Sequence, residues 1–197
     1  MSKFSRRTKI IASFIIIIAV GYGVVLFSQS ENKVPADFTA ARLQGAIIAQ
    51  TIVNNSNQST DELSAINKDD QDGDYTAALA STTALINQSA GLRNEAVQLS
   101  TQVGQMTKDL SDINSAPAQQ EALESISSHL AVINELITYS NDLDHLLAVL
   151  QSRFSGTTVP NSEVTGIVNQ INTDVNAINN FNAQAGQAMD QFDTIEK

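Results

Sequence analysis

Apolar and small residues recur at spacings of three and four along most of the chain, which is the pattern of helices that bury one face. Short polar stretches divide this pattern into four segments, which predict helices over about 37–67, 74–113, 116–154 and 161–195. The second segment is the most regular, because its stripe keeps alternating steps of four and three over about five heptads. A sustained period of 3.5 residues indicates helices wound around one another.

Each stripe predicts which positions face the core. In the first helix these are Phe38, Ala41, Gly45, Ile48, Ile52, Ser56, Ser59, Leu63 and Ile66. In the second they are Ala78, Thr82, Leu85, Ser89, Leu92, Ala96, Leu99, Val103, Met106, Leu110 and Ile113. In the third helix the stripe begins with Leu123, Ile126, Leu130, Ile133 and Ile137, shifts near Leu136, and continues through Ser140, Leu143, Leu147, Leu150 and Phe154. The shift indicates a local change of supercoil.

The fourth helix carries two adjoining stripes, one from Val164 through Val175 to Phe192 and one from Ile167 through Phe181 to Ile195. A stripe of that width contacts more than one neighbour. The first helix has the weakest apolar face of the four. An apolar surface left over when the helices have packed is therefore expected on these two helices.

Turn and capping residues mark the ends of the segments. Pro35 separates the first helix from what precedes it, and Gly73 can take a positive φ. The expected N-caps are Asp37, Asp74, Ser115, and either Asn161 or Ser162. The sequence NNSNQST at 54–60 is poor helix material, because Asn and Ser compete for backbone hydrogen bonds. A break there is an alternative to a continuous first helix.

Four long helices with short connections favour antiparallel neighbours. The predicted fold class is all-α: an N-terminal transmembrane helix followed by an up-down-up-down four-helix bundle. The alternative is a three-helix bundle on which the first helix is loosely docked.

The N-terminus carries the membrane signal. Residues 10–27 are eighteen residues without a charge, and at about 1.5 Å per residue they would span roughly 27 Å of bilayer as a helix. Residues 1–9 hold four basic side chains, so the positive-inside rule places them in the cytoplasm. The expected organisation continues with a polar linker at 28–36 and an extracytoplasmic bundle at 37–197. A cleaved signal peptide is the alternative, although its apolar core is normally about 7–15 residues.

The net charge of the chain limits the classes of partner that it can bind. All 21 acidic residues lie beyond residue 30, together with only seven of the 11 Lys and Arg, which gives that part a net charge of −14. Such a surface repels nucleic acid and anionic lipid headgroups. The chain has no Cys, which excludes disulfides, thiolate metal sites and a Cys nucleophile. It also has no Trp.

The acidic stretch at 67–74 resembles a Ca²⁺ loop only in part. Asp70, Asp72 and Asp74 are weak candidates for metal ligands. An EF-hand loop needs an acidic first residue and a bidentate Glu at its twelfth position, where this chain has Lys68 and Leu79. The pattern favours a solvated turn between helices, and no metal or other cofactor is inferred.

None of the remaining motifs indicates a catalytic site. His129 and His145 are sixteen residues apart on one helix, too far to share a metal, and neither accompanies a glycine-flanked nucleophile. We expect His129 to pack half-buried and His145 to be exposed. The chain is therefore not expected to be an enzyme, and no small-molecule substrate is inferred.

The expected function is a single-pass, membrane-anchored, extracytoplasmic helical bundle that acts as a structural or protein-interaction module. Its expected partners are the lipid bilayer, through residues 10–27, and either another protein or a second copy. The alternative is a sensor or ligand-binding ectodomain working through a membrane partner, since the architecture resembles the membrane-flanked four-helix input domains of bacterial chemoreceptors and sensor kinases.

Overall fold

The computed structural model describes residues 34–196, so the expected anchor at 10–27 lies outside the described residues. The four helices are α1 (Ala36–Asp72), α2 (Tyr75–Asp109), α3 (Ala116–Phe154) and α4 (Asn161–Ile195), and a 3₁₀ turn, η1 (Leu110–Asp112), follows α2. They contain 37, 35, 39 and 35 residues. At 1.5 Å per residue, each is roughly 50–60 Å long.

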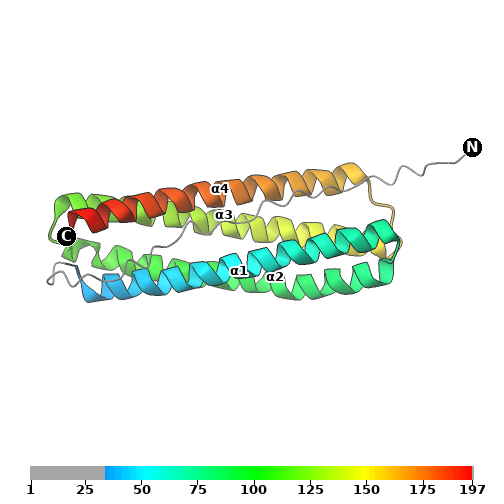
Figure 1. Ribbon diagram of the computed structural model, residues 1–197, viewed down its shortest axis with the longest axis horizontal. Coiled ribbons are helices and arrows are strands. Elements are labelled where there is room, and N and C mark those ends of the chain that lie inside the picture. The colour runs from blue at the N-terminus through cyan, green and yellow to red at the C-terminus, as the bar shows by residue number, and fades with distance from the viewer. Residues whose placement is uncertain (1–33, 197) are drawn as a thin grey trace, which may run out of the picture.

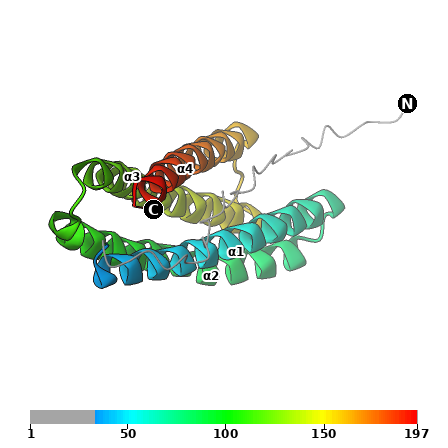
Figure 2. The same ribbon diagram turned by 60° about the vertical axis from the view of Figure 1, so that its left-hand side comes forward.

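The helices run alternately up and down and lie side by side, with the start of α1 and the end of α4 at the same end of the molecule (Figure 1). Among the described residues the closest helix pairs are α3 with α4, α1 with α2, and α2 with α3. The predicted all-α four-helix bundle is confirmed. The three-helix alternative is wrong, because α1 packs closely along α2 rather than docking loosely. Figure 2 shows the α1–α2 pair lying beside the α3–α4 pair.

The first helix is continuous through 54–60. Its polar side chains there bond within the helix: the Ser59 hydroxyl donates to the Asn55 carbonyl at 2.9 Å, and the Thr60 hydroxyl donates to the Ser56 carbonyl at 3.0 Å. A hydroxyl that bonds one turn back is satisfied without leaving the helix. The small side chains of Ser56 and Ser59 can therefore be buried against the neighbouring helices.

Every position predicted to be buried in α1 is buried. The same holds for the α2 stripe from Ala78 to Met106 and for Ile113, whereas Leu110 is half-buried where the chain turns into η1. In α4, the wide stripe is confirmed over most of its length, but Phe181 is half-buried and Ile195 is exposed.

The predicted stripe of α3 is confirmed at Ile126, Ile133 and from Ser140 onward, but three positions of its first half are wrong. Leu123, Leu130 and Ile137 are exposed, with fractional exposures of 47, 50 and 37 %. The core is lined instead by a straight stripe that needs no shift: Ala118, Ala122, Ser125, Ile126, His129, Val132, Ile133, Leu136 and the residues that follow. These positions share one helix face with Leu143, Leu147 and Phe154 at 3.6 residues per turn. Small residues in the first turns let α3 approach its neighbours closely.

Two of the four expected N-caps are confirmed. The Asp74 carboxylate accepts a hydrogen bond from the Ala77 amide at 3.0 Å, and the Ser115 hydroxyl accepts one from the Ala118 amide at 3.4 Å. The caps expected for α1 and α4 are wrong: Pro35 and Pro160 occupy the N-cap positions there, without side-chain capping bonds. The fixed φ of proline begins each of these helices earlier than a polar cap would.

Candidate functional site in the seam between α1 and α4

The seam between α1 and α4 is closed at the end of the bundle where α1 begins and α4 ends. The Phe38 and Phe192 rings lie 5.5 Å apart between centroids. One turn further along, the Arg42 guanidinium donates to both carboxylate oxygens of Asp193, at 2.6 and 2.7 Å. A bidentate pair of this kind fixes orientation as well as distance. Beyond it, α1 and α4 are not among the close helix pairs, so the seam opens.

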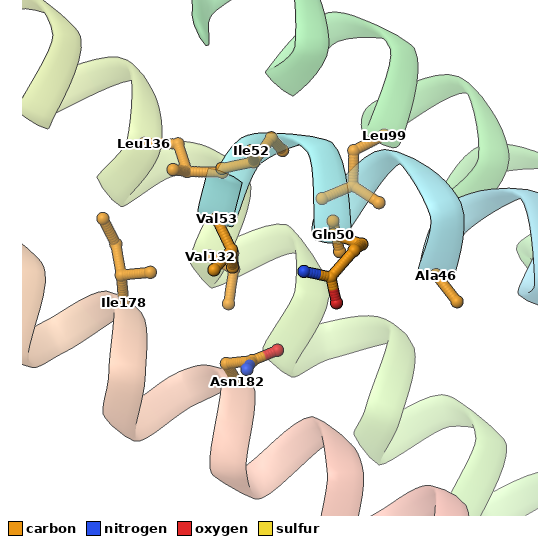
Figure 3. Close-up of a pocket in the computed structure, with 10 residues that line it drawn as sticks. Ala46, Gln50, Ile52, Val53, Leu99, Val132, Leu136, Ile178 and Asn182 are labelled. Atoms are coloured by element: carbon orange, nitrogen blue, oxygen red, sulfur yellow. The ribbon is translucent and has the colours of Figure 1, made fainter. Parts of the chain in front are cut away.

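A cavity of about 40 Å³ occupies the open part of the seam (Figure 3). Its walls are short side chains of α1 (Ala46, Ala49, Val53) and the Ile178 side chain of α4, and its deep end reaches the core at Ile52, Leu99, Val132 and Leu136. All four helices therefore contribute to it. The cavity exists because small α1 side chains face α4 where a bundle would otherwise place larger apolar ones.

Two amide side chains lie at the mouth of this apolar cavity. Gln50 comes from α1 and Asn182 from α4, and both extend toward the space between the two helices (Figure 3). Each amide offers a donor and an acceptor. Leu43, which is 45 % exposed, precedes Ala46 by three residues and Gln50 by seven, so it lies on the same face of α1 as the mouth. The site can therefore hold an apolar side chain and hydrogen-bond the groups beside it.

A second polar feature is buried between α3 and α4. Asp174 is only 2 % exposed; its Oδ1 accepts from the Gln170 amide at 2.9 Å, and its Oδ2 has no hydrogen-bond partner. The pKa of Asp174 is raised to about 6, chiefly by burial and also by the nearby carboxylates of Asp142 and Glu135, while the Gln170 hydrogen bond opposes the shift. Burial, aided by Asp174, also raises the pKa of Tyr139 to about 12. An Asp at a stripe position, between Ile171 and Ile178, is the sequence signal that could have found this group.

The two histidines have different surroundings. His129 is buried rather than half-buried, and its Nδ1–H donates to the Ser125 carbonyl at 2.8 Å. Burial lowers the pKa of His129 to about 4, although the Ser125 hydrogen bond opposes this. His145 is exposed, as predicted. Neither histidine lies in the cavity between α1 and α4.

The carboxylates of the acidic turn between α1 and α2 make different interactions. Asp70 pairs with Arg153 of α3 at 3.0 Å, and Asp74 caps α2. Gly73 adopts the left-handed φ of 78° that was expected and ends α1, directly after Asp72. Among the described residues, no three His, Asp or Glu side chains come together as a metal-binding group.

Two further findings bear on function. Within residues 34–196, no helix combines the length and the apolarity needed to cross a membrane. Comparison of the chain with protein-family models, curated proteins and solved structures found no match.

Proposed function

We propose that the protein is a single-pass membrane-anchored module whose extracytoplasmic bundle binds an amphipathic helix of another protein in the seam between α1 and α4. Residues 10–27 form the anchor and residues 1–9 remain in the cytoplasm. The bound helix inserts an apolar side chain into the cavity lined by Ala49, Val53 and Ile178, and its flanking polar groups meet the amides of Gln50 and Asn182. The observation that carries the proposal is the apolar cavity in the seam between α1 and α4, a helix pair that is not among the closely packed ones.

The size of the cavity favours a protein partner over a small ligand. Sites for drug-sized molecules enclose about 300–1,000 Å³, whereas this cavity has about 40 Å³. That room suits one inserted side chain, and helix-in-groove recognition works through such anchors spaced along one helix face. The exposed Leu43 beside the mouth extends the apolar strip for a second anchor.

Charge defines the partner further. The part of the chain beyond residue 30 has a net charge of −14, so a basic segment is steered toward it and an acidic one is repelled. The partner is therefore a helix with a narrow apolar stripe and basic flanks.

Site-specific photocrosslinking in intact membranes tests the binding site. A photoreactive residue at Gln50 should capture a partner protein, and sequencing of the crosslinked peptide should identify an amphipathic helix with basic flanks. The matched control is Gln58, which is exposed on α1 two turns further on. Filling the cavity with Ala49→Leu should abolish capture at position 50. Equal capture at 50 and 58, or capture that survives Ala49→Leu, contradicts the proposed groove. Displacement of the partner by a small metabolite would instead support the sensor alternative.

Protease treatment of intact cells tests the anchor separately. Cleavage should release the bundle from the cell surface at positions beyond about residue 30 while leaving the N-terminus with the membrane. Complete protection of the bundle contradicts the proposed topology without bearing on the groove.

A further inference from the structure

The exposed apolar residues of α3 form a regular stripe. Leu123, Leu130 and Ile137 follow one another at intervals of seven residues, and each is between 37 and 50 % exposed. A heptad interval keeps side chains along one side of a helix. The rest of the described chain, residues 34–196, leaves between about a third and a half of each of these side chains open to solvent.

The neighbouring helix α2 extends this apolar face. The Ser89 hydroxyl donates to Asp144 at 2.5 Å, and Arg93 donates to Asn141 at 2.7 Å. These bonds fix the antiparallel register of α2 and α3. Continued along the helices, the same register puts Val97, which is 58 % exposed, beside Ile137.

The register also puts Gly104 of α2 beside Leu130. A Cβ atom added to Gly104 would meet nothing within 4 Å. The face defined by Val97, Leu123, Leu130 and Ile137, which we call the α2–α3 face, therefore has open space beside its central leucine.

The α2–α3 face has no charge in the middle, although the chain is strongly acidic. Between Arg93 and Lys108 the only charged residue of α2 is Glu95, whose carboxylate accepts from Asn55 of α1 at 2.5 Å. Between Glu124 and Asp142 of α3, the only Asp, Glu, Lys, Arg or His residues are His129, which is buried, and Glu135, which is close enough to affect Asp174 of α4.

From the stripe and its missing charge, we infer that the α2–α3 face binds a second copy of this chain, with the two α3 helices parallel. Two acidic bundles repel each other wherever the carboxylates of one face those of the other. Two copies can therefore meet through a strip that carries no charge. A basic partner would gain nothing from this strip and would be drawn to the carboxylates elsewhere.

The sequence of the stripe suits a pair of parallel helices. With Leu123, Leu130 and Ile137 at d positions, the a positions are Ser127, Asn134 and Asn141. In parallel two-stranded coiled coils Leu at d is favoured, and a polar Asn at a fixes register and oligomeric state at a cost in stability. The predicted interface is therefore specific but weak.

The parallel orientation rests on the proposed anchor. Two copies held in one membrane have their bundles pointing the same way, so each d residue meets its own counterpart across a two-fold axis. Confinement to a membrane also raises the effective concentration, which lets a narrow apolar strip suffice.

Disulfide crosslinking of the full chain in native membranes tests the inference, because the chain has no Cys of its own. Single variants Ser127→Cys and Asn134→Cys should each form disulfide dimers rapidly on mild oxidation, since a positions bring counterparts within about 7 Å. The control is Asn180→Cys, exposed on α4. Contact between Asp142 and Asp174 sets the α3–α4 register and puts position 180 at a similar height.

We expect the α3 variants to crosslink at least about tenfold faster than the control. All three variants carry the same N-terminus, so dimerisation through the anchor alone would crosslink them at equal rates and overturn the inference. Crosslinking only in a mixture of the Ser127→Cys and Asn134→Cys proteins would mean an antiparallel pair, which also overturns it. Loss of the anchor would show separately, as protein in the soluble fraction.

A second substitution separates the interface from the fold. Leu130→Asn in the Asn134→Cys background should reduce crosslinking severalfold, while circular dichroism shows an unchanged helix content. Ile47→Asn, at a residue of α1 that is 53 % exposed, should leave the crosslinking rate unchanged. Equal effects of the two substitutions would contradict a specific role of the α2–α3 face.

Discussion

Asp174→Asn is expected to stabilise the protein near neutral pH and to have no effect in acid. The Asp174 carboxyl has a pKa of about 6 in the folded protein, against an ordinary value of 3.8. Its charged form is therefore disfavoured by folding: the destabilisation is fully present above about pH 6 and is released as the pH falls toward 3.8. A pKa difference of about two corresponds to roughly 3 kcal/mol. An Asn side chain keeps the acceptor for Gln170, and its amide can donate toward Asp142.

The buried histidine acts in the opposite direction. The pKa of His129 is about 4 in the folded protein, against 6.5 ordinarily. Above about pH 6.5 His129 does not lower the free energy of unfolding. As the pH falls toward 4 it does, because the unfolded chain then binds the additional proton. The two groups therefore compensate in the wild type, whose free energy of unfolding should change little between these pH values. In the Asp174→Asn variant only the histidine remains, so that protein should lose stability steadily on acidification.

Urea unfolding followed by circular dichroism, at several pH values from about 7.5 to about 4, measures both effects. The variant should be more stable than the wild type by up to about 3 kcal/mol at the upper end, and the difference should vanish at the lower end. Asp190→Asn, at an exposed residue of the same helix, serves as the control and should shift stability by less than about 0.5 kcal/mol. A stability difference that does not vary with pH, or a variant less stable than the wild type at neutral pH, would refute the reasoning.

Three further experiments probe the packing. Leu136→Ala, at a residue that is 1 % exposed, should lower the free energy of unfolding by about 2–5 kcal/mol, whereas Leu130→Ala should lower it by less than about 1 kcal/mol. Similar losses for the two variants in urea unfolding would mean that the assigned buried face of α3 is wrong. Replacing Gly73, whose φ is 78°, by Ala should cost about 1–2 kcal/mol, and replacing it by Asn should cost less, because Asn tolerates this conformation; equal costs would argue against backbone strain. In a double-mutant cycle, Arg42→Gln and Asp193→Asn should show a coupling of about 1 kcal/mol that weakens with salt, and additive losses would mean that the pair contributes nothing.

The fold could be predicted from local patterns because the four stripes leave few ways to pack. Short turns at Gly73 and Ser115 make sequential helices antiparallel neighbours, so the topology follows. The front half of α3 could not be predicted in this way, because Leu130 and His129 belong to two stripes with the same period. A count of apolar residues selects the leucines, whereas the structure selects the stripe that continues straight into Leu143.

The candidate site was only partly accessible to sequence reasoning. The wide stripe of α4 and the weak face of α1 indicated the two helices where packing would be incomplete. The cavity itself depends on small α1 side chains such as Ala49 facing α4 across the seam, and no local pattern shows which residues meet between helices so distant in the chain. Asp174 was missed because a single carboxylate in an apolar stripe hardly changes the periodicity.

The order of the helix pairs has a consequence for how the chain folds. The α1–α2 and α3–α4 pairs pack closely, and each is joined by a short connection, so most of their contacts are local in sequence and should form early as the chain is synthesised. The Arg42–Asp193 pair, whose members are 151 residues apart, can form only once α4 has been synthesised. Until α4 is complete, the side of α1 that faces α4 should remain uncovered in the growing chain.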